Sequence, residues 1–333
     1  MKRRPGKSGK GRRIFLAAAA AVMLAGSVSG CSGKISSLVS EGMGTEGFSD
    51  AQMMLVVASE RNRCQKIYTD QIWDIAVDDA GTTFQTYLLA EIQKFLKELR
   101  VMNLLADERQ ISLSAREKEQ LNALADSYYE SMSEADRAYT GASRDDVYTM
   151  YEAYHRANRL VDALTQNVNL EVRDSEARVI TVQEASFAQE SEAQAFWRRV
   201  TEDGIDFQAA VKESSLDGTA EKSVGRGERQ KAYEDAVFAL ESGQISPVFQ
   251  DGERWYVVKC VNDYDENATL ERKQKMALER KNQAFRQIYD SFAENHQVES
   301  NGGFWERLSL KDGAESETDD FFEQYRQVMD GEN

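Results

Sequence analysis

The sequence predicts an α+β protein in which a mostly helical body is interrupted by one small mixed α/β domain. Three observations lead to this prediction. Apolar residues recur at steps of three and four over long stretches between residues 49 and 169, as on the buried face of a helix. Two apolar runs of strand type, at 179–182 and 255–261, enclose short helical patterns and glycine turns. The 333 residues include only two prolines, which favours long helices over many turns.

Residues 1–30 are predicted to be a lipoprotein signal peptide. A stretch with seven Lys and Arg precedes an apolar run from Ile14 to Ala25, which is too short to span a bilayer. Small residues then lead into Cys31, an ending that resembles the lipobox of bacterial lipoproteins. The resemblance implies cleavage before Cys31 and lipid on that cysteine. The alternative is an ordinary secretory signal with a cysteine at its cleavage site.

The expected location is therefore the extracytoplasmic face of the cell membrane, where the lipid on Cys31 anchors a water-facing body. Residues 31–48 are small and polar and are expected to form a flexible tether. No later stretch of the sequence is apolar enough to be predicted as a membrane span.

The charge of the chain excludes several classes of partner. The whole sequence has a formal charge of −16, and loss of the seven basic signal residues leaves 34 Lys and Arg against 57 Asp and Glu, or −23. Such an acidic protein is not expected to bind nucleic acid or to lie on an anionic lipid surface. Cys64 and Cys260 are expected to be free buried thiols, although one disulfide between them is arithmetically possible. No metal site and no cofactor is expected.

Residues 49–172 are predicted to form a helical N-terminal domain. Ser114 with Glu117, and Ser143 with Asp146, have the spacing of capping boxes at helix starts. Two amphipathic stripes mark buried helix faces: Phe84, Leu88, Ile92, Phe95, Leu99 and Met102; then Val147, Met150, Tyr154, Ala157, Val161 and Leu164. The tyrosines near these faces are interpreted as core and interface residues. A loose apolar groove for peptides is the alternative.

Residues 173–266 are predicted to form the compact α/β domain, with a strand near 179–182, helices at 192–201, 207–214 and 233–240, and a closing strand at 255–261. Residues 267–333 are predicted to form a long charged helix from about 269 to 296 and a tail. The tail is long enough to pack back on the N-terminal helices.

The central domain resembles the parvulin-type peptidyl-prolyl isomerases, and the order of all segments resembles the PrsA/SurA class of extracytoplasmic foldases. The following strings carry the resemblance: Gly204-Ile205-Asp206-Phe207, Ser214-Ser215-Leu216-Asp217, Gly225-Arg226-Gly227-Glu228, Tyr233 to Leu240, Gly243-Gln244-Ile245-Ser246-Pro247-Val248, and Trp255-Tyr256-Val257-Val258-Lys259. The resemblance implies a helical chaperone body around an inserted isomerase domain. It also implies that the partners are unfolded or nascent secreted polypeptides.

The resemblance also assigns candidate site residues. Asp217 falls at the Cys or Asp position of the parvulin polar network, and Tyr256 falls where the closing-strand histidine belongs, so both are candidate catalytic residues. The remaining candidates line the substrate groove. They are Glu184, near the first-strand histidine position; Arg229, where an apolar methionine is usual; Tyr233, where a phenylalanine is usual; and the buried Phe238.

The sequence departs from the parvulin pattern at both histidines of that network. The only two histidines in the chain, His155 and His296, lie outside residues 173–266. Two functions remain open. One is a foldase that catalyses prolyl isomerisation, weakly or with altered chemistry. The other is a non-catalytic holdase that uses a degenerate parvulin domain to bind peptides. An envelope lipoprotein with a purely structural role is a third alternative.

Overall fold

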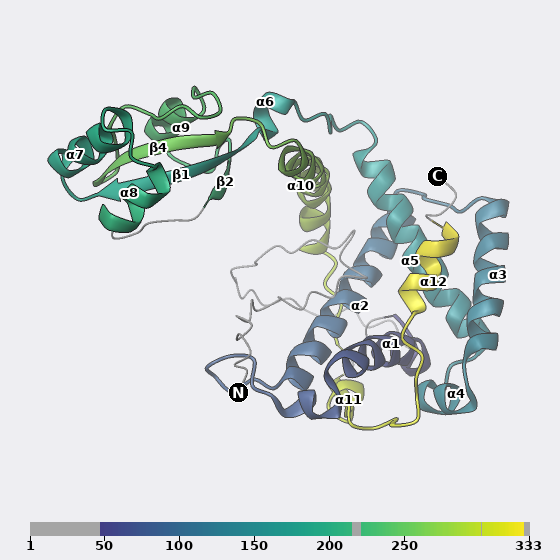
Figure 1. Ribbon diagram of the computed structural model, residues 1–333. Helices are drawn as coiled ribbons and strands as arrows, with labels where there is room; N and C mark the ends of the chain where they lie inside the picture. The colour runs from purple at the N-terminus through teal and green to yellow at the C-terminus, as the bar shows by residue number, and fades with distance from the viewer. Residues whose placement is uncertain (1–46, 215–220, 301, 330–333) are drawn as a thin grey trace, which may run out of the picture. The chain divides into compact units, whose positions relative to one another are not determined.

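The computed structural model describes residues 47–214, 221–300 and 302–329 (Figure 1), and Cys31 and Asp217 lie outside these ranges. Two compact units are formed. One contains the described residues up to Gln166 together with those from Ala284 onward, and the other is Asn167–Gln283. The first is helical and the second carries one small sheet, so the predicted fold class is confirmed.

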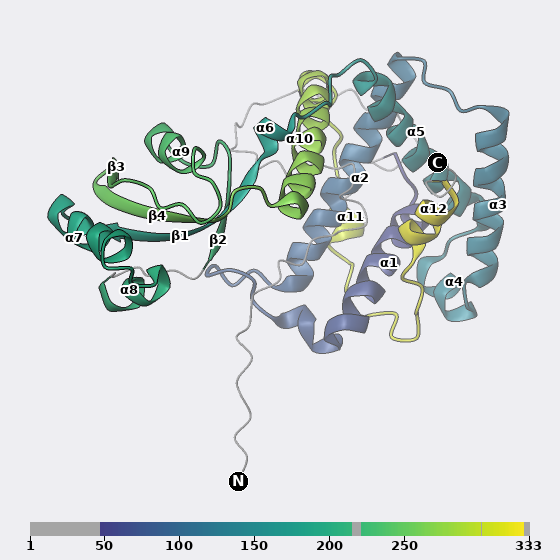
Figure 2. The same cartoon turned by 45° about the horizontal axis from the view of Figure 1, so that its top comes forward.

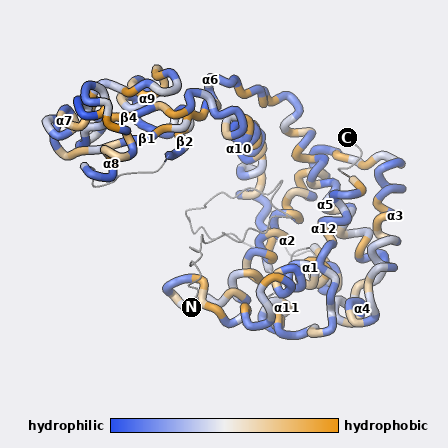
Figure 3. The backbone as a smooth tube through the Cα atoms, viewed as in Figure 1, coloured by the Kyte–Doolittle hydropathy of each residue, from blue (hydrophilic) through white to orange (hydrophobic). Residues whose placement is uncertain are grey.

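The helical unit is built around α1. Its helices and short turns are α1 (Asp50–Tyr68), η1 (Asp70–Asp74), α2 (Phe84–Glu108), α3 (Ala115–Ser131), α4 (Glu134–Thr140), α5 (Arg144–Thr165), the end of α10 (Glu266–Ala293), α11 (Gly302–Trp305) and α12 (Phe321–Met329). Every residue of α1 from Met53 to Asn62 is buried, so this helix is covered on all sides. Along α2, α3 and α5, hydrophobic and hydrophilic stretches alternate, as amphipathic helices require (Figure 3).

Side-chain caps start these helices where the sequence predicts them. Ser114 and Glu117 form a reciprocal capping box at the start of α3, and Ser143 and Asp146 form another at the start of α5. Each box satisfies backbone N–H groups that have no partner within the first helical turn. The tyrosines interpreted as core residues include Tyr128, Tyr151 and Tyr154, which are all buried.

The C-terminal segment packs along the helical unit. Phe321 of α12 stacks on Tyr151 of α5 with ring centroids 4.2 Å apart. The carboxylate of Asp136 accepts hydrogen bonds from the hydroxyl of Ser316 (2.9 Å) and from the backbone N–H of Thr318 (3.0 Å). The segment therefore contributes both apolar surface and hydrogen bonds to this core.

His155 belongs to the same junction. One ring nitrogen lies 2.7 Å from the Tyr325 hydroxyl and the other lies 3.1 Å from the carboxylate of Glu117. Burial opposes the charge of Glu117, but hydrogen bonds from Ser114 and His155 lower its pKa to about 2. The histidine thus has a structural role between α3, α5 and α12.

The second unit contains an antiparallel four-stranded sheet with the order β2-β1-β4-β3. Its elements are α6 (Asp174–Ala177), β1 (Val179–Phe187), α7 (Glu190–Thr201), α8 (Phe207–Ser214), β2 (Lys222–Gly225), α9 (Lys231–Val237), β3 (Phe249–Asp251), β4 (Arg254–Asn262) and the first part of α10. Helices α7 and α8 cover one face of the sheet and α9 covers the other (Figure 2). Alternate residues of β1 and β4 therefore enter two separate apolar clusters.

Both described cysteines are free thiols and are buried, as predicted. Cys64 lies in α1, where burial raises the pKa of its thiol to about 11. Cys260 lies in β4 in the other unit, and burial raises the pKa of this thiol as well. A thiol that stays protonated and buried is a poor nucleophile, so both residues act as packing groups.

Candidate functional site

Strand register brings two of the predicted site residues onto one face of the sheet. Strands β1 and β4 pair antiparallel, with Glu184 opposite Val258 and Ser186 opposite Tyr256. Residues two apart on a strand, and residues directly opposite on its neighbour, share a face. Glu184 and Tyr256 therefore both lie on the face that α9 covers.

Three aromatic rings form the apolar part of this face, and we call them the aromatic wall: Tyr233 of α9, Phe249 of β3 and Tyr256 of β4. The Tyr233 ring meets the other two edge to face, with centroids 5.7 Å from Phe249 and 5.8 Å from Tyr256. Phe249 and Tyr256 stack at 5.7 Å. Tyr233 is fully buried, whereas the other two rings are partly exposed. A ligand can therefore contact Phe249 and Tyr256, whereas Tyr233 packs beneath them.

The carboxylate of Glu184 is held at the base of the wall. Its Oε2 accepts a hydrogen bond of 2.7 Å from the Tyr233 hydroxyl, and its Oε1 forms an ion pair with Lys222 of β2. Burial, followed by the nearby charge of Glu184, raises the pKa of Tyr233 well above its usual value. Tyr233 is therefore a fixed hydrogen-bond donor, and both oxygens of Glu184 already have partners.

Arg229 covers the remaining face of Tyr233. Its guanidinium carbon lies 4.3 Å from the centroid of the Tyr233 ring, the geometry of a cation–π contact, and one of its nitrogens lies 3.8 Å from Oε2 of Glu184. The backbone N–H of Arg229 donates to the carboxylate of Glu234 (3.3 Å), which fixes the loop before α9. A charged group thus occupies the position next to the apolar wall.

The Tyr256 hydroxyl is the polar group of the wall that is open to a ligand. Among the described residues it has no hydrogen-bond partner, and it is not sealed from solvent. A phenol both donates and accepts hydrogen bonds, so it suits a peptide carbonyl or amide nitrogen. The wall itself therefore offers apolar contact plus one hydrogen bond, and the guanidinium of Arg229 adds a positive charge beside it.

The predicted site residues separate into three groups. Glu184, Arg229, Tyr233 and Tyr256 are brought together. Phe238 is buried in the same apolar cluster, but its ring lies under Arg226, whose guanidinium carbon is 4.5 Å from the ring centroid. Asp217 lies outside the described residues.

Two members of the site were not found from the sequence. Lys222 pairs with Glu184 only because β2 and β1 are neighbours, and no local pattern indicates that pairing. Phe249 directly follows the string Gly243 to Val248, which carries part of the parvulin resemblance. Its position in the sequence could therefore have indicated that it belongs to the site, whereas nothing local indicated Lys222.

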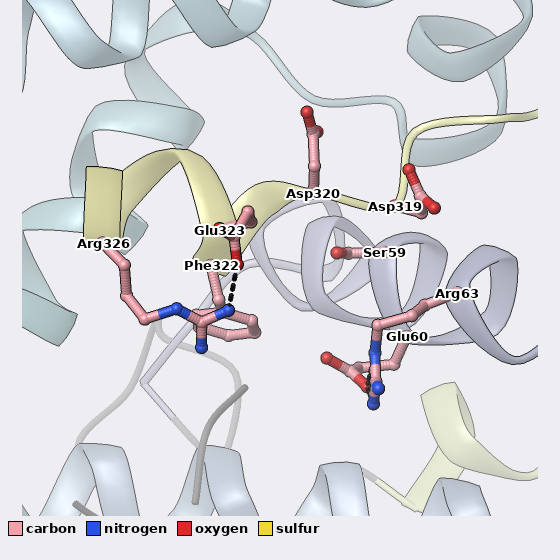
Figure 4. Close-up of a pocket in the computed structure, with 8 residues that line it drawn as sticks. All are labelled: Ser59, Glu60, Arg63, Asp319, Asp320, Phe322, Glu323 and Arg326. Carbon is pink, nitrogen blue, oxygen red and sulfur yellow. Dashed lines mark hydrogen bonds and ion pairs between the residues drawn. The ribbon is translucent and has the colours of Figure 1, made fainter. Parts of the chain in front are cut away.

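The helical unit contains a separate cavity of about 230 Å³ between α1 and α12 (Figure 4). It is rich in carboxylates, but Glu60 is paired with Arg63 along α1, and Glu323 is paired with Arg326 along α12. Burial raises the pKa of Glu60 above its usual value despite that pairing. The described residues contain no group of three or more His, Cys, Asp and Glu arranged to hold a metal ion. The cavity is interpreted as a seam between packed helices.

Residues 171–272 match the sequence family described as the PPIC-type PPIASE domain. No curated protein matches the chain significantly. No helix within the described residues is both long enough and apolar enough to cross a membrane. The family match covers the unit that carries the aromatic wall, and it confirms the parvulin resemblance for this domain.

Solved structures of foldases are weakly similar to the chain. Peptidylprolyl isomerase (PrsA) from Bacillus cereus has 15% sequence identity and a TM-score of 0.33, over 76% of this chain and 98% of that one. Foldase protein PrsA from Streptococcus pneumoniae has 16% identity and a TM-score of 0.32, over 70% and 96%. PrsA from Bacillus subtilis has 16% identity and a TM-score of 0.25, over 74% and 99%. At these scores the functional conclusion depends on the domain family and on the site.

Proposed function

We propose that this protein is a foldase tethered to the outer face of the cell membrane by lipid on Cys31, and that its PPIC-type domain binds prolyl segments of unfolded secreted polypeptides. The aromatic wall beside the Tyr256 hydroxyl is the observation that carries the proposal. It offers a flat apolar surface and one hydrogen-bonding group in the domain that matches the PPIC-type family. The acidic body suits a soluble protein that handles other chains without holding them tightly.

Isomerisation about a prolyl bond makes modest chemical demands. The barrier of about 18–20 kcal/mol arises because rotation breaks amide resonance, so no nucleophile is needed. An enzyme lowers it by favouring the twisted amide over both planar forms, through apolar contact and well-placed hydrogen bonds. Among the described residues, the hydrogen-bonding groups left for a ligand are the Tyr256 hydroxyl and the guanidinium of Arg229, since Glu184 and Tyr233 bond to each other and no histidine lies in this domain. We therefore expect weak catalysis.

A holdase without turnover is the second candidate function. Full burial of Tyr233 beneath Arg229 favours it, because this ring then supports the wall without touching the ligand. Binding through Phe249 and Tyr256 is compatible with both candidates. The two functions differ in whether the bound prolyl amide rotates faster than in water.

A refolding assay separates the candidates. The chain from residue 32 onward is expected to suppress aggregation of a proline-free client and to speed a proline-limited refolding phase only slightly. The rate is expected to be nearly flat between pH 6 and 8, because no histidine lies within residues 171–272. Suppressed aggregation with no rate above buffer would leave the holdase. If neither effect is seen, the proposed function is wrong.

Lipid anchoring is tested by replacing Cys31 with serine. Without the thiol no acyl chain is attached, so we expect loss of lipid labelling and either release of the protein or accumulation of the uncleaved precursor. Metabolic labelling with a tagged fatty acid and membrane fractionation measure both effects. Cys64→Ser is the matched control and is expected to label normally. Undiminished labelling of the Cys31→Ser protein would contradict the lipoprotein assignment.

A further inference from the structure

The guanidinium of Arg229 has unused hydrogen-bonding capacity. An arginine side chain carries five N–H donors. Among the described residues, the side chain of Arg229 makes one ion pair, at 3.8 Å, and no hydrogen bond. It remains 33% exposed while its flat face rests on Tyr233. The Tyr233 ring thus orients the guanidinium of Arg229, and the N–H donors of that guanidinium are available to a bound ligand.

The carboxylates around the guanidinium of Arg229 are held by other groups. Glu184, the nearest carboxylate, is already paired with Lys222 and bonded to the Tyr233 hydroxyl. Glu234 accepts from the backbone N–H groups of Gly227 and Arg229, and Glu228 pairs with Arg272. Each neighbouring carboxylate therefore has a partner of its own. None of these three carboxylates forms a hydrogen bond with the side chain of Arg229, so its guanidinium donors remain open to a ligand at the edge of the aromatic wall.

We infer that Arg229 is a specificity-determining residue that selects polypeptide segments in which an acidic residue immediately precedes the proline. The inference rests on the proposed function, because it specifies which prolyl peptides bind at the aromatic wall. An isomerase twists the peptide bond between the proline and the residue before it. The Cα atoms of these two residues are about 3.8 Å apart. The side chain of the preceding residue therefore lies close to the ring that the proline contacts. A carboxylate there matches the fork of a guanidinium better than an amide or an ammonium group does.

The test compares three short peptides that differ only in the residue before proline: glutamate, glutamine or lysine. Binding to the chain from residue 32 onward is measured by calorimetry or by NMR titration. The glutamate peptide is expected to bind about five- to tenfold more tightly than the glutamine peptide, because a partly exposed charge-assisted contact has that modest size. The lysine peptide is expected to bind most weakly. Raising the salt concentration should shrink the differences.

Arg229→Gln is expected to remove the preference for glutamate over glutamine while keeping the binding that the aromatic wall provides. Arg226→Gln is the matched control, since Arg226 also stacks on an aromatic ring, but on Phe238, which is not one of the three rings of the wall. This control should keep the full preference. Equal binding of the glutamate and glutamine peptides to the wild type overturns the inference alone, as does a preference that persists in Arg229→Gln. Absence of binding by all three peptides overturns the proposed function and the inference with it.

Discussion

A chain that ends at Ser300 is expected to lose the cooperative fold of its helical unit. The missing segment supplies five buried hydrophobic side chains: Phe304, Leu310, Phe321, Phe322 and Tyr325. Burying each of them stabilises the fold by about 1.5–3 kcal/mol, so together they contribute on the order of 10 kcal/mol. That is comparable with the whole stability of a typical domain, about 5–15 kcal/mol. The helices that remain would expose Tyr151, which stacks on Phe321.

Polar groups make the loss larger. Arg61 is buried, with 2% of its surface exposed, and its Nε donates to the carbonyl of Leu310 (2.8 Å). Asn62 donates to the carbonyl of Thr318 (2.8 Å), and the Tyr151 hydroxyl donates to that of Phe321 (3.0 Å). Removing the segment leaves these donors without their acceptors. They then either stay buried and unsatisfied or become exposed to solvent together with the apolar core. Each unsatisfied group costs about 1–3 kcal/mol, and a buried charge costs more.

Circular dichroism, fluorescence of the buried Trp73 and limited proteolysis measure the outcome. We expect the shortened chain to lose the thermal transition of the helical unit, whereas Val328→Ala, on an exposed position of α12, should retain it. An unchanged transition after truncation would show that the N-terminal helices form a core by themselves.

A graded version of this test uses Asp136→Ala. Burial opposes the charge of this carboxylate, but hydrogen bonds from Thr318, Ser133 and Ser316 keep its pKa below the usual value. The stability that Asp136 contributes is fully present at pH values above its pKa in the unfolded chain. It is lost as the pH falls through the lower pKa that this carboxyl has in the folded protein. The substitution is therefore expected to cost about 2–4 kcal/mol at neutral pH and progressively less in acid. Urea titrations at several pH values measure it.

Local signals were sufficient for the long helices and for strands β1 and β4, whereas the short strands β2 and β3 were not predicted. The capping boxes of α3 and α5 depend on residues three apart, and the stripes of α2 and α5 depend on residues three and four apart. These spacings reflect the geometry of the helix backbone, which places residues three and four apart on one face. Ser133 and Asp136 have the same spacing and form a capping box at the start of α4. Where short-range patterns in the central domain and α10 predicted an element, its ends lie within five residues of the observed ones; the largest difference is at β1, which was expected to end at 182 and ends at Phe187.

Long-range pairing was not accessible from local patterns. Nothing near Arg61 indicates that a charged residue in α1 will be buried against a carbonyl some 249 residues later. The partner of Glu184 is likewise set by sheet register and not by sequence spacing. The two compact units divide between Gln283 and Ala284, inside the continuous helix α10, where no change in helical pattern marks the division. The boundaries predicted for the domains therefore remain a proposal.

Tyr233 is expected to be the most sensitive position of the PPIC-type domain. Its ring is fully buried and contacts both other members of the aromatic wall. Tyr233→Ala leaves a cavity behind Phe249 and Tyr256, and large-to-small changes of aromatic residues in a core cost about 3–5 kcal/mol. Phe249 and Tyr256, which are partly exposed, would lose the ring that supports them. We therefore expect both the stability of the domain and its affinity for prolyl peptides to decrease.

Tyr233→Phe isolates the hydroxyl from the ring. It keeps the apolar support but removes the donor to Oε2 of Glu184, which Arg229 approaches only to 3.8 Å. We expect a loss of about 1–2 kcal/mol in stability, because a partly buried carboxylate oxygen loses its hydrogen bond, with peptide binding nearly unchanged. Denaturant unfolding followed at Trp197 and Trp255, and peptide titration under conditions where both variants stay folded, measure the two effects separately. If Tyr233→Phe loses binding as severely as Tyr233→Ala, the hydroxyl is itself part of the binding site, and the assignment of Tyr233 as a support for the wall is wrong.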